Sequence, residues 1–146
     1  MLFRSKGWAA WGKYNDQLFK ENPDNIHHAA QAVHCYLQAA GIFKNRRTRP
    51  LLARVLWLLS VDDASLSVSR AFDTYKGDAA YWYWITLIPQ LCLSLSQREL
   101  KQARYLLLNL AKLYPQVRTR MIFVLRYSNM ALVRHCFSSC APRRKT

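Results

Sequence analysis

Two adjacent aspartates, Asp62 and Asp63, are the first residues of this sequence that could do chemistry. Paired carboxylates can bind a metal ion or act as acid and base, but such pairs normally come from different elements and face one another across a substrate. Neighbours on one turn suit a helix N-terminus better, because a carboxylate there accepts hydrogen bonds from unpaired N–H groups. We therefore predict that both aspartates are helix caps.

Histidines and cysteines form a second possible site, for a metal ion. His27, His28, His34 and Cys35 lie in one helical segment, but none has a paired thiol at zinc-finger spacing. His27 and His34 are seven residues apart, which is two helical turns and too far for one ion. Solvated or core histidines are the better interpretation.

Known catalytic motifs are absent from the sequence, which has no G-x-S-x-G, no phosphate-binding loop and no kinase loop. Cys136 and Cys140 could share a helix face, but two further metal ligands are missing. We expect no catalytic residue, no metal ion and no cofactor, so the chain is not expected to be an enzyme.

A basic segment, formed by Lys44, Arg46, Arg47 and Arg49, is the one exposed feature with functional charge. Clustered arginines can bind phosphates or an acidic partner. An ordinary solvated loop is the alternative. The segment is therefore a candidate anion or partner contact.

The net charge of +14 is unevenly distributed along the chain. Residues 117–146 hold seven of the 22 Lys and Arg and none of the eight acidic residues, so half of the excess lies there. This break in composition divides the chain into a segment 1–116 and a basic tail 117–146, which we expect to be poorly packed or only weakly helical.

Apolar residues recur three or four positions apart through most of residues 1–116, which predicts amphipathic helices. Six helices group as three hairpins, at 5–40, 50–76 and 80–114. The residues predicted to form the structural core are Trp8, Trp11, Leu52, Val55, Leu56, Leu59, Trp84, Ile88, Leu91, Leu106 and Leu110.

Helix ends are predicted from capping and breaking residues. Gly41 stands where a helix usually stops in a left-handed conformation, and Pro50 suits the first turn of the next helix. Pro89 should kink a helix over 81–95. Ser96 and Glu99 form an S-x-x-E capping box that should start the sixth helix.

The resulting fold class is all-α, with antiparallel helix hairpins stacked as an α-solenoid of the tetratricopeptide or HEAT kind. The stretch LLARVLWLLS, residues 51–60, is apolar on most sides, so this helix should lie between neighbours. It carries Arg54 and is shorter than the roughly 20 apolar residues of a membrane span. We expect a fragment of a larger array.

Several long motifs occur here in a specific order: KGWAAWGKYND, CYLQAAGIFKN, LLARVLWLLSVDDA, YWYWITLIPQL, LSQRE and AKLYPQ. Together they resemble the FAT-domain solenoid of the transformation/transcription domain-associated protein family, especially its fungal members. This family belongs to the phosphatidylinositol 3-kinase-related kinases. The resemblance covers about residues 5–116.

The resemblance implies a non-catalytic scaffold segment of a transcription coactivator subunit. The family's kinase-like domain lies elsewhere and is catalytically dead, so these proteins are pseudokinases. They are nuclear subunits of histone acetyltransferase complexes of the SAGA type and are contacted by transcription activators. The implied partners are therefore other complex subunits and activators, without a membrane and without direct nucleic-acid contact.

Two alternatives stay open from the residues alone: an autonomous helical-repeat adaptor that binds peptides or acidic partners, and a basic nucleic-acid-binding module. The tail after Gln116 has no counterpart in the family pattern. We hypothesise that it is translated intron or misannotated sequence, which sequencing of the native transcript across the Gln116 codon tests.

Overall fold

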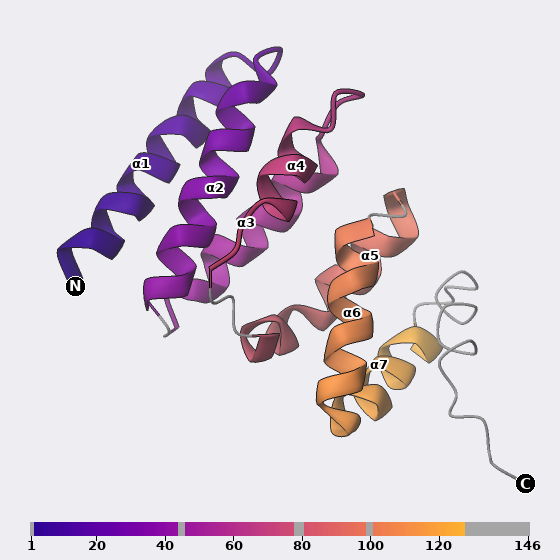
Figure 1. Cartoon of the computed structure of the whole chain (residues 1–146). Helices are drawn as coiled ribbons and strands as arrows, with labels where there is room; N and C mark the ends of the chain where they lie inside the picture. Colours follow the sequence, from indigo (N-terminus) through magenta and orange to yellow (C-terminus); the bar gives the residue numbers. More distant parts are fainter. Residues whose placement is uncertain (1, 44–45, 78–80, 99–100, 128–146) are drawn as a thin grey trace, which may run out of the picture. The chain divides into compact units, whose positions relative to one another are not determined.

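The computed structural model describes residues 2–43, 46–77, 81–98 and 101–127, and the regular elements of these residues are all helical (Figure 1). They are α1 (Leu2–Glu21), α2 (Ile26–Phe43), α3 (Thr48–Ser60), α4 (Ser67–Asp73), the 3₁₀ helix η1 (Tyr81–Leu87), α5 (Ile88–Arg98), α6 (Lys101–Leu113) and α7 (Pro115–Tyr127). The prediction of an all-α helical-repeat fragment is confirmed. No helix within the described ranges has both the length and the apolar character needed to cross a membrane.

The chain divides into two compact units, Met1–Leu87 and Ile88–Thr146. In the first unit α1 and α2 form an antiparallel hairpin, and α2 also packs against α3 and α4 (Figure 1). This central position explains why α2 buries residues on several sides, among them Ala32, Val33 and Cys35. Helix α2 is therefore the element around which the first unit is built.

Helix α3 lies between neighbours, as its apolar sequence predicts. It packs against α2, α4 and η1, and its four predicted core residues, Leu52, Val55, Leu56 and Leu59, are buried. Trp57 stays exposed, because it points away from these neighbours and stacks under the guanidinium of Arg54. The aromatic residue thus covers the charged side chain rather than the core.

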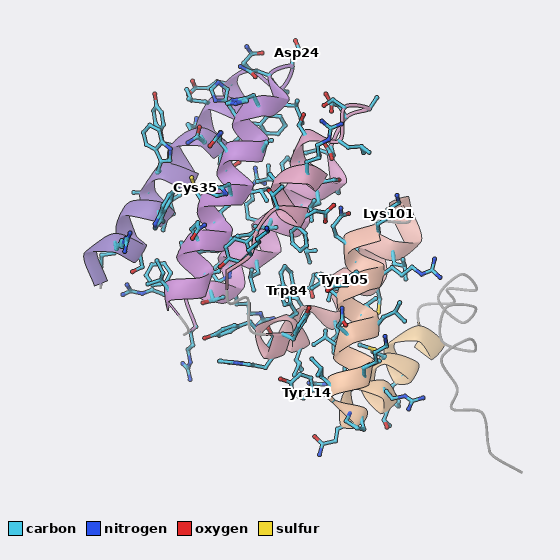
Figure 2. All side chains as sticks on the ribbon, viewed as in Figure 1. Asp24, Cys35, Trp84, Lys101, Tyr105 and Tyr114 are labelled. Carbon is cyan, nitrogen blue, oxygen red and sulfur yellow. The ribbon has the colours of Figure 1, made fainter. Side chains whose placement is uncertain are left out.

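The buried face of α1 differs from the one predicted. Trp11 is 55% exposed and Trp8 is only half-buried, so the assignment of Trp11 to the core is wrong. The helix instead buries Gly12 and Asp16, since the backbone of α1 approaches α2 closely at Gly12. A β-carbon built at Gly12 would lie 2.8 Å from the Tyr36 ring and 3.2 Å from Cβ of Cys35, which Figure 2 shows between the two helices.

Two predicted helix boundaries are wrong. Helix α2 continues through Gly41 to Phe43, because a single glycine costs a helix only about 1 kcal/mol and the apolar residues after it still pack. The segment 81–95 is not one kinked helix but η1 followed by α5. Pro89 cannot donate the helical hydrogen bond to the carbonyl of Ile85, so the α-helix starts only at Ile88.

In the second unit α5 packs against α6 and α7, and α6 packs against α7. The predicted core residues Ile88, Leu91, Leu106 and Leu110 are buried. The predicted start of the sixth helix is displaced, since Ser96 lies inside α5 and α6 begins at Lys101. Glu99, the other half of the predicted capping box, lies outside the described residues.

Helix α7 crosses the position at which the basic tail was predicted to begin. It runs from Pro115 to Tyr127 and buries Val117 and Met121. The expectation of poor packing is therefore wrong for residues 117–121, because these two apolar side chains are one turn apart and face the same side of the helix. Residues 128–146 lie outside the described residues, and the boundary at Gln116 stays a prediction.

Two glycines of α1 give a matched test of the α1–α2 contact. Gly12→Ala should lower the free energy of unfolding by about 1–2 kcal/mol, because the added methyl group overlaps the buried ring of Tyr36. Gly7→Ala should raise it by about 0.5–1 kcal/mol, since nothing lies within 4 Å of the new β-carbon and alanine favours the helix. Urea denaturation followed by circular dichroism measures both changes. Equal effects of the two substitutions would contradict the close contact.

Candidate functional site

A buried carboxylate connects the first three helices. Asp16 on α1 accepts a hydrogen bond of 3.0 Å from the Tyr36 hydroxyl on α2. It also accepts two bonds from Arg54 on α3, of 2.8 Å from Nε and 2.7 Å from Nη2. The side chain of Asp16 is 7% exposed and that of Arg54 is 26% exposed. This two-pronged ion pair fixes α1 and α3 against α2.

The chemistry of Tyr36 keeps this network intact near neutral pH. Burial raises the pKa of the Tyr36 hydroxyl far above its usual range, and the neighbouring Asp16 carboxylate raises it further. The hydroxyl therefore remains protonated and donates to the carboxylate. The guanidinium carbon of Arg54 lies 3.8 Å from the centre of the Trp57 ring, which adds a cation–π contact on the solvent side.

The aspartate pair organises a helix start. Asp62 accepts hydrogen bonds from the backbone N–H groups of Val68 at 3.2 Å and Ser69 at 2.9 Å, both in the first turn of α4. Asp63 accepts from the N–H of Ser65 and so holds the loop before α4, not the helix itself. Leu66, the residue directly before α4, has a left-handed backbone with φ of 55° and turns the chain into the helix.

Among the candidate metal ligands, the rings of His27 and His28 are neighbours with centres 6.3 Å apart, whereas His34 and Cys35 pack against α1. His34 contacts Trp8 edge to face, with ring centres 5.9 Å apart, and Cys35 is buried beside Gly12. Within the residues that the structure describes, no three His, Cys, Asp or Glu side chains lie close enough to hold a metal ion. Cys136 and Cys140 lie outside them.

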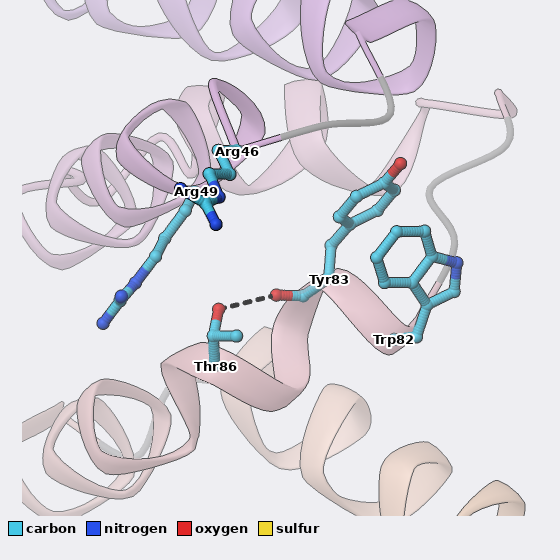
Figure 3. Close-up of a pocket in the computed structure, with 5 residues that line it drawn as sticks. All are labelled: Arg46, Arg49, Trp82, Tyr83 and Thr86. Carbon is cyan, nitrogen blue, oxygen red and sulfur yellow. Dashed lines mark hydrogen bonds between the residues drawn. The ribbon is translucent and has the colours of Figure 1, made fainter.

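The basic segment separates into two cavities around the start of α3. Arg46 and Arg49 line one of about 560 Å³, together with Trp82, Tyr83 and Thr86 of η1 (Figure 3). The indole of Trp82 is 49% exposed and lies 3.7 Å, centre to centre, from the Tyr83 ring. The hydroxyl of Thr86 donates to the Tyr83 carbonyl at 3.1 Å. Lys44 lies outside the described residues.

Arg47 points to the other cavity, a groove of about 550 Å³ over α2 that is bounded by α1 and α3. The first wall is a stripe of α1 and the second a stripe of α3. Phe43 and Tyr36 of α2 form the floor between them. The wall residues are Lys6, Ala9, Ala10 and Lys13 on α1, and Arg47 at the N-cap of α3 with Pro50, Leu51 and Arg54 in that helix.

Sequence reasoning found Arg46, Arg47 and Arg49 but missed Asp16, Tyr36 and the structural role of Arg54. A lone arginine in the apolar run LLARVLWLLS was the available signal, because a charge there needs a partner. The identity of that partner depends on helix packing and not on spacing.

Comparison with known proteins identifies relatives of this chain. The FAT domain family model matches residues 4–57. The SAGA complex/NuA4 acetyltransferase complex subunit TRA1 of Saccharomyces cerevisiae is 52% identical over 112 residues, 77% of this chain and 3% of that protein. Its Schizosaccharomyces pombe counterpart is 50% identical over 121 residues, 83% of this chain and again 3% of the relative.

An animal relative extends the comparison beyond the yeasts. The human transformation/transcription domain-associated protein is 35% identical over 111 residues, which make up 76% of this chain and 3% of the human protein. The chain thus spans about 3% of the length of each of these three relatives.

The buried ion pair predicts a specific loss of stability. Asp16→Asn should lower the free energy of unfolding by about 2–3 kcal/mol, because it leaves the partly buried Arg54 without a carboxylate. Asp24→Asn, at an exposed aspartate of the α1–α2 turn, should change it by less than about 0.5 kcal/mol. Chemical denaturation of the two variants measures the difference. A loss no larger than that of the control would refute the linking role of Asp16.

The buried thiols predict a fall in stability at high pH. Burial raises the pKa of Cys35 and of Cys92 from 9.0 to about 11, so the folded chain disfavours both thiolates. Their contribution is fully present below pH 9, the unfolded value, and is lost as pH rises from there through the folded value. Urea denaturation as a function of pH should show this decline. Iodoacetamide should modify both thiols faster in unfolded than in folded chain. A double substitution to alanine should flatten the pH dependence, and an unchanged slope would contradict the assignment.

Proposed function

Because this chain is a FAT-domain segment of the transformation/transcription domain-associated protein family, we propose that it acts as a non-catalytic scaffold segment of a transcription coactivator subunit. The observation that carries the proposal is the 52% identity over 112 residues to a subunit named for the SAGA and NuA4 acetyltransferase complexes. Similarity at this level over most of the chain supports the same place in a similar assembly.

The chemistry of the described residues supports a scaffold role. Asp62 is occupied as a helix cap, and Asp16 is held by Tyr36 and Arg54. Cys35 and Cys92 are buried, and their raised pKa keeps them as thiols, whereas catalysis needs an accessible thiolate. Helical repeats instead offer extended surfaces to other proteins.

We propose that the partners of the whole protein are other subunits of a histone acetyltransferase complex and transcription activators. Such a role places the protein in the nucleus. We do not expect direct contact with nucleic acid, although the exposed arginines at the start of α3 keep that alternative testable. The kinase-like part of the family lies outside the present segment, so we expect no phosphoryl transfer from it.

A segment exchange tests the scaffold role. In the S. cerevisiae relative, the 112-residue segment that matches this chain is replaced by the chain's own residues. The exchanged protein should enter its acetyltransferase complexes at the level of the unmodified protein. Affinity purification followed by a histone acetylation assay measures assembly and activity together.

A matched control separates folding from function in this exchange. The same chimera with Val55→Asp places a charge in a fully buried position of α3 and should fail to assemble. If the unmodified chimera accumulates at a normal level but does not copurify with acetyltransferase activity, the scaffold proposal is wrong.

A further inference from the structure

The groove over α2 has two walls with the same pattern. On α1 the wall reads Lys6-x2-Ala9-Ala10-x2-Lys13. Along α3 it reads Arg47-x2-Pro50-Leu51-x2-Arg54, starting from the N-cap Arg47, whose backbone is already helical. Positions i, i+3, i+4 and i+7 form one stripe of a helix. Each wall therefore presents an apolar centre with a cation at each end, and the two cations of a wall are about 10 Å apart along the axis.

The two walls are held in register by the Asp16–Arg54 pair. The connections from α1 to α2 and from α2 to α3 are short, so α1 and α3 run in the same direction (Figure 1). Asp16, three residues after Lys13, bonds to Arg54 at that end of the groove. Lys6 and Arg47 consequently lie toward the other end. Because this ion pair fixes α1 and α3 before any ligand binds, the entropic cost of binding is lower.

The charge of the groove selects the kind of partner. Lys6, Lys13 and Arg47 are exposed, and none of the described lining residues is acidic. Arg54 is held by Asp16, so it contributes mainly shape. The aliphatic centre of the walls and the ring of Phe43 provide an apolar surface that a solvated anion alone would leave uncovered.

We propose that this groove binds an acidic amphipathic helix of a partner protein. The complementary pattern is E-x2-L-L-x2-E, with carboxylates at i and i+7 and apolar residues at i+3 and i+4. The leucines cover Ala9, Ala10 and Leu51, while the two glutamates pair with Lys6 and Lys13 of α1. A volume of about 550 Å³ admits a few side chains of such a helix. This binding role goes beyond the scaffold role and does not depend on it.

A nucleic-acid ligand fits the groove less well. Single-stranded nucleic acids bind through exposed rings on which bases stack. The Tyr36 ring at the floor is buried and engaged with Asp16, and the centre of both walls is aliphatic. An exposed indole, that of Trp82, lines the separate cavity at η1. The peptide is therefore the ligand that we propose.

The test uses the full chain and a fluorescein-labelled synthetic peptide that contains E-x2-L-L-x2-E. Fluorescence anisotropy should show binding that weakens about tenfold when both glutamates are replaced by glutamine. Lys13→Glu and Lys6→Glu should each weaken binding about five- to tenfold, because each puts a like charge against a carboxylate. Increasing NaCl from about 50 to about 500 mM should weaken it as well.

Two further variants make the result specific to the groove. Ala10→Trp fills the groove without a change of charge and should weaken peptide binding about tenfold or more. Lys76→Glu reverses an exposed charge that does not line the groove and should leave affinity within about twofold. Circular dichroism should show equal helix content in all variants, since every substituted residue is exposed.

One outcome of these measurements supports the proposal and two overturn it. Loss of peptide binding in the three groove variants, with binding retained by Lys76→Glu, supports the proposal. Binding that is indifferent to Ala10→Trp, or reduced equally by the control, overturns it. Tighter binding of a single-stranded oligonucleotide than of the peptide, lost in the same groove variants, also overturns it in favour of a nucleic-acid site. None of these results bears on whether the segment exchange assembles.

Discussion

The buried carboxylate of Asp16 is the interaction on which the first unit depends. A single carboxyl side chain receives hydrogen bonds from α2 and α3 while it projects from α1. Its desolvation is unfavourable unless both partners are in place, so the three helices are fixed together and not pairwise. The close approach at Gly12 and the parallel walls of the groove both follow from this arrangement.

Helix content could be predicted from the sequence because apolar residues that recur every three or four positions indicate a helix without knowledge of its partners. The stripe Leu52, Val55, Leu56 and Leu59 defines both the existence and the buried face of α3. The same periodicity gave the wrong face for α1, because it placed Trp11 in the core, whereas Trp11 is exposed. Apart from Phe19, the residues that α1 buries are small or polar, and the burial of Asp16 becomes favourable only through partners 20 and 38 residues away.

The candidate site was predictable in composition but not in geometry. A cluster of arginines is visible in the sequence as a possible anion contact. Arg47 lines the groove with Lys6 and Lys13, whereas Arg46 and Arg49 line the cavity with Trp82. This division depends on how the turn before α3 leads into the helix. Helix ends were likewise uncertain, because Gly41 and Ser96 both lie inside helices whose packing outweighs the local signal.

The separation of 38 residues between Asp16 and Arg54 has a consequence for how the chain is made. A ribosome delivers α1 and α2 first, and these two can pair while α3 is still being synthesised. During that interval the carboxylate of Asp16 has the Tyr36 hydroxyl but no counter-charge. The nascent hairpin therefore remains incomplete until α3 emerges, and the order of synthesis sets the moment at which the first unit becomes stable.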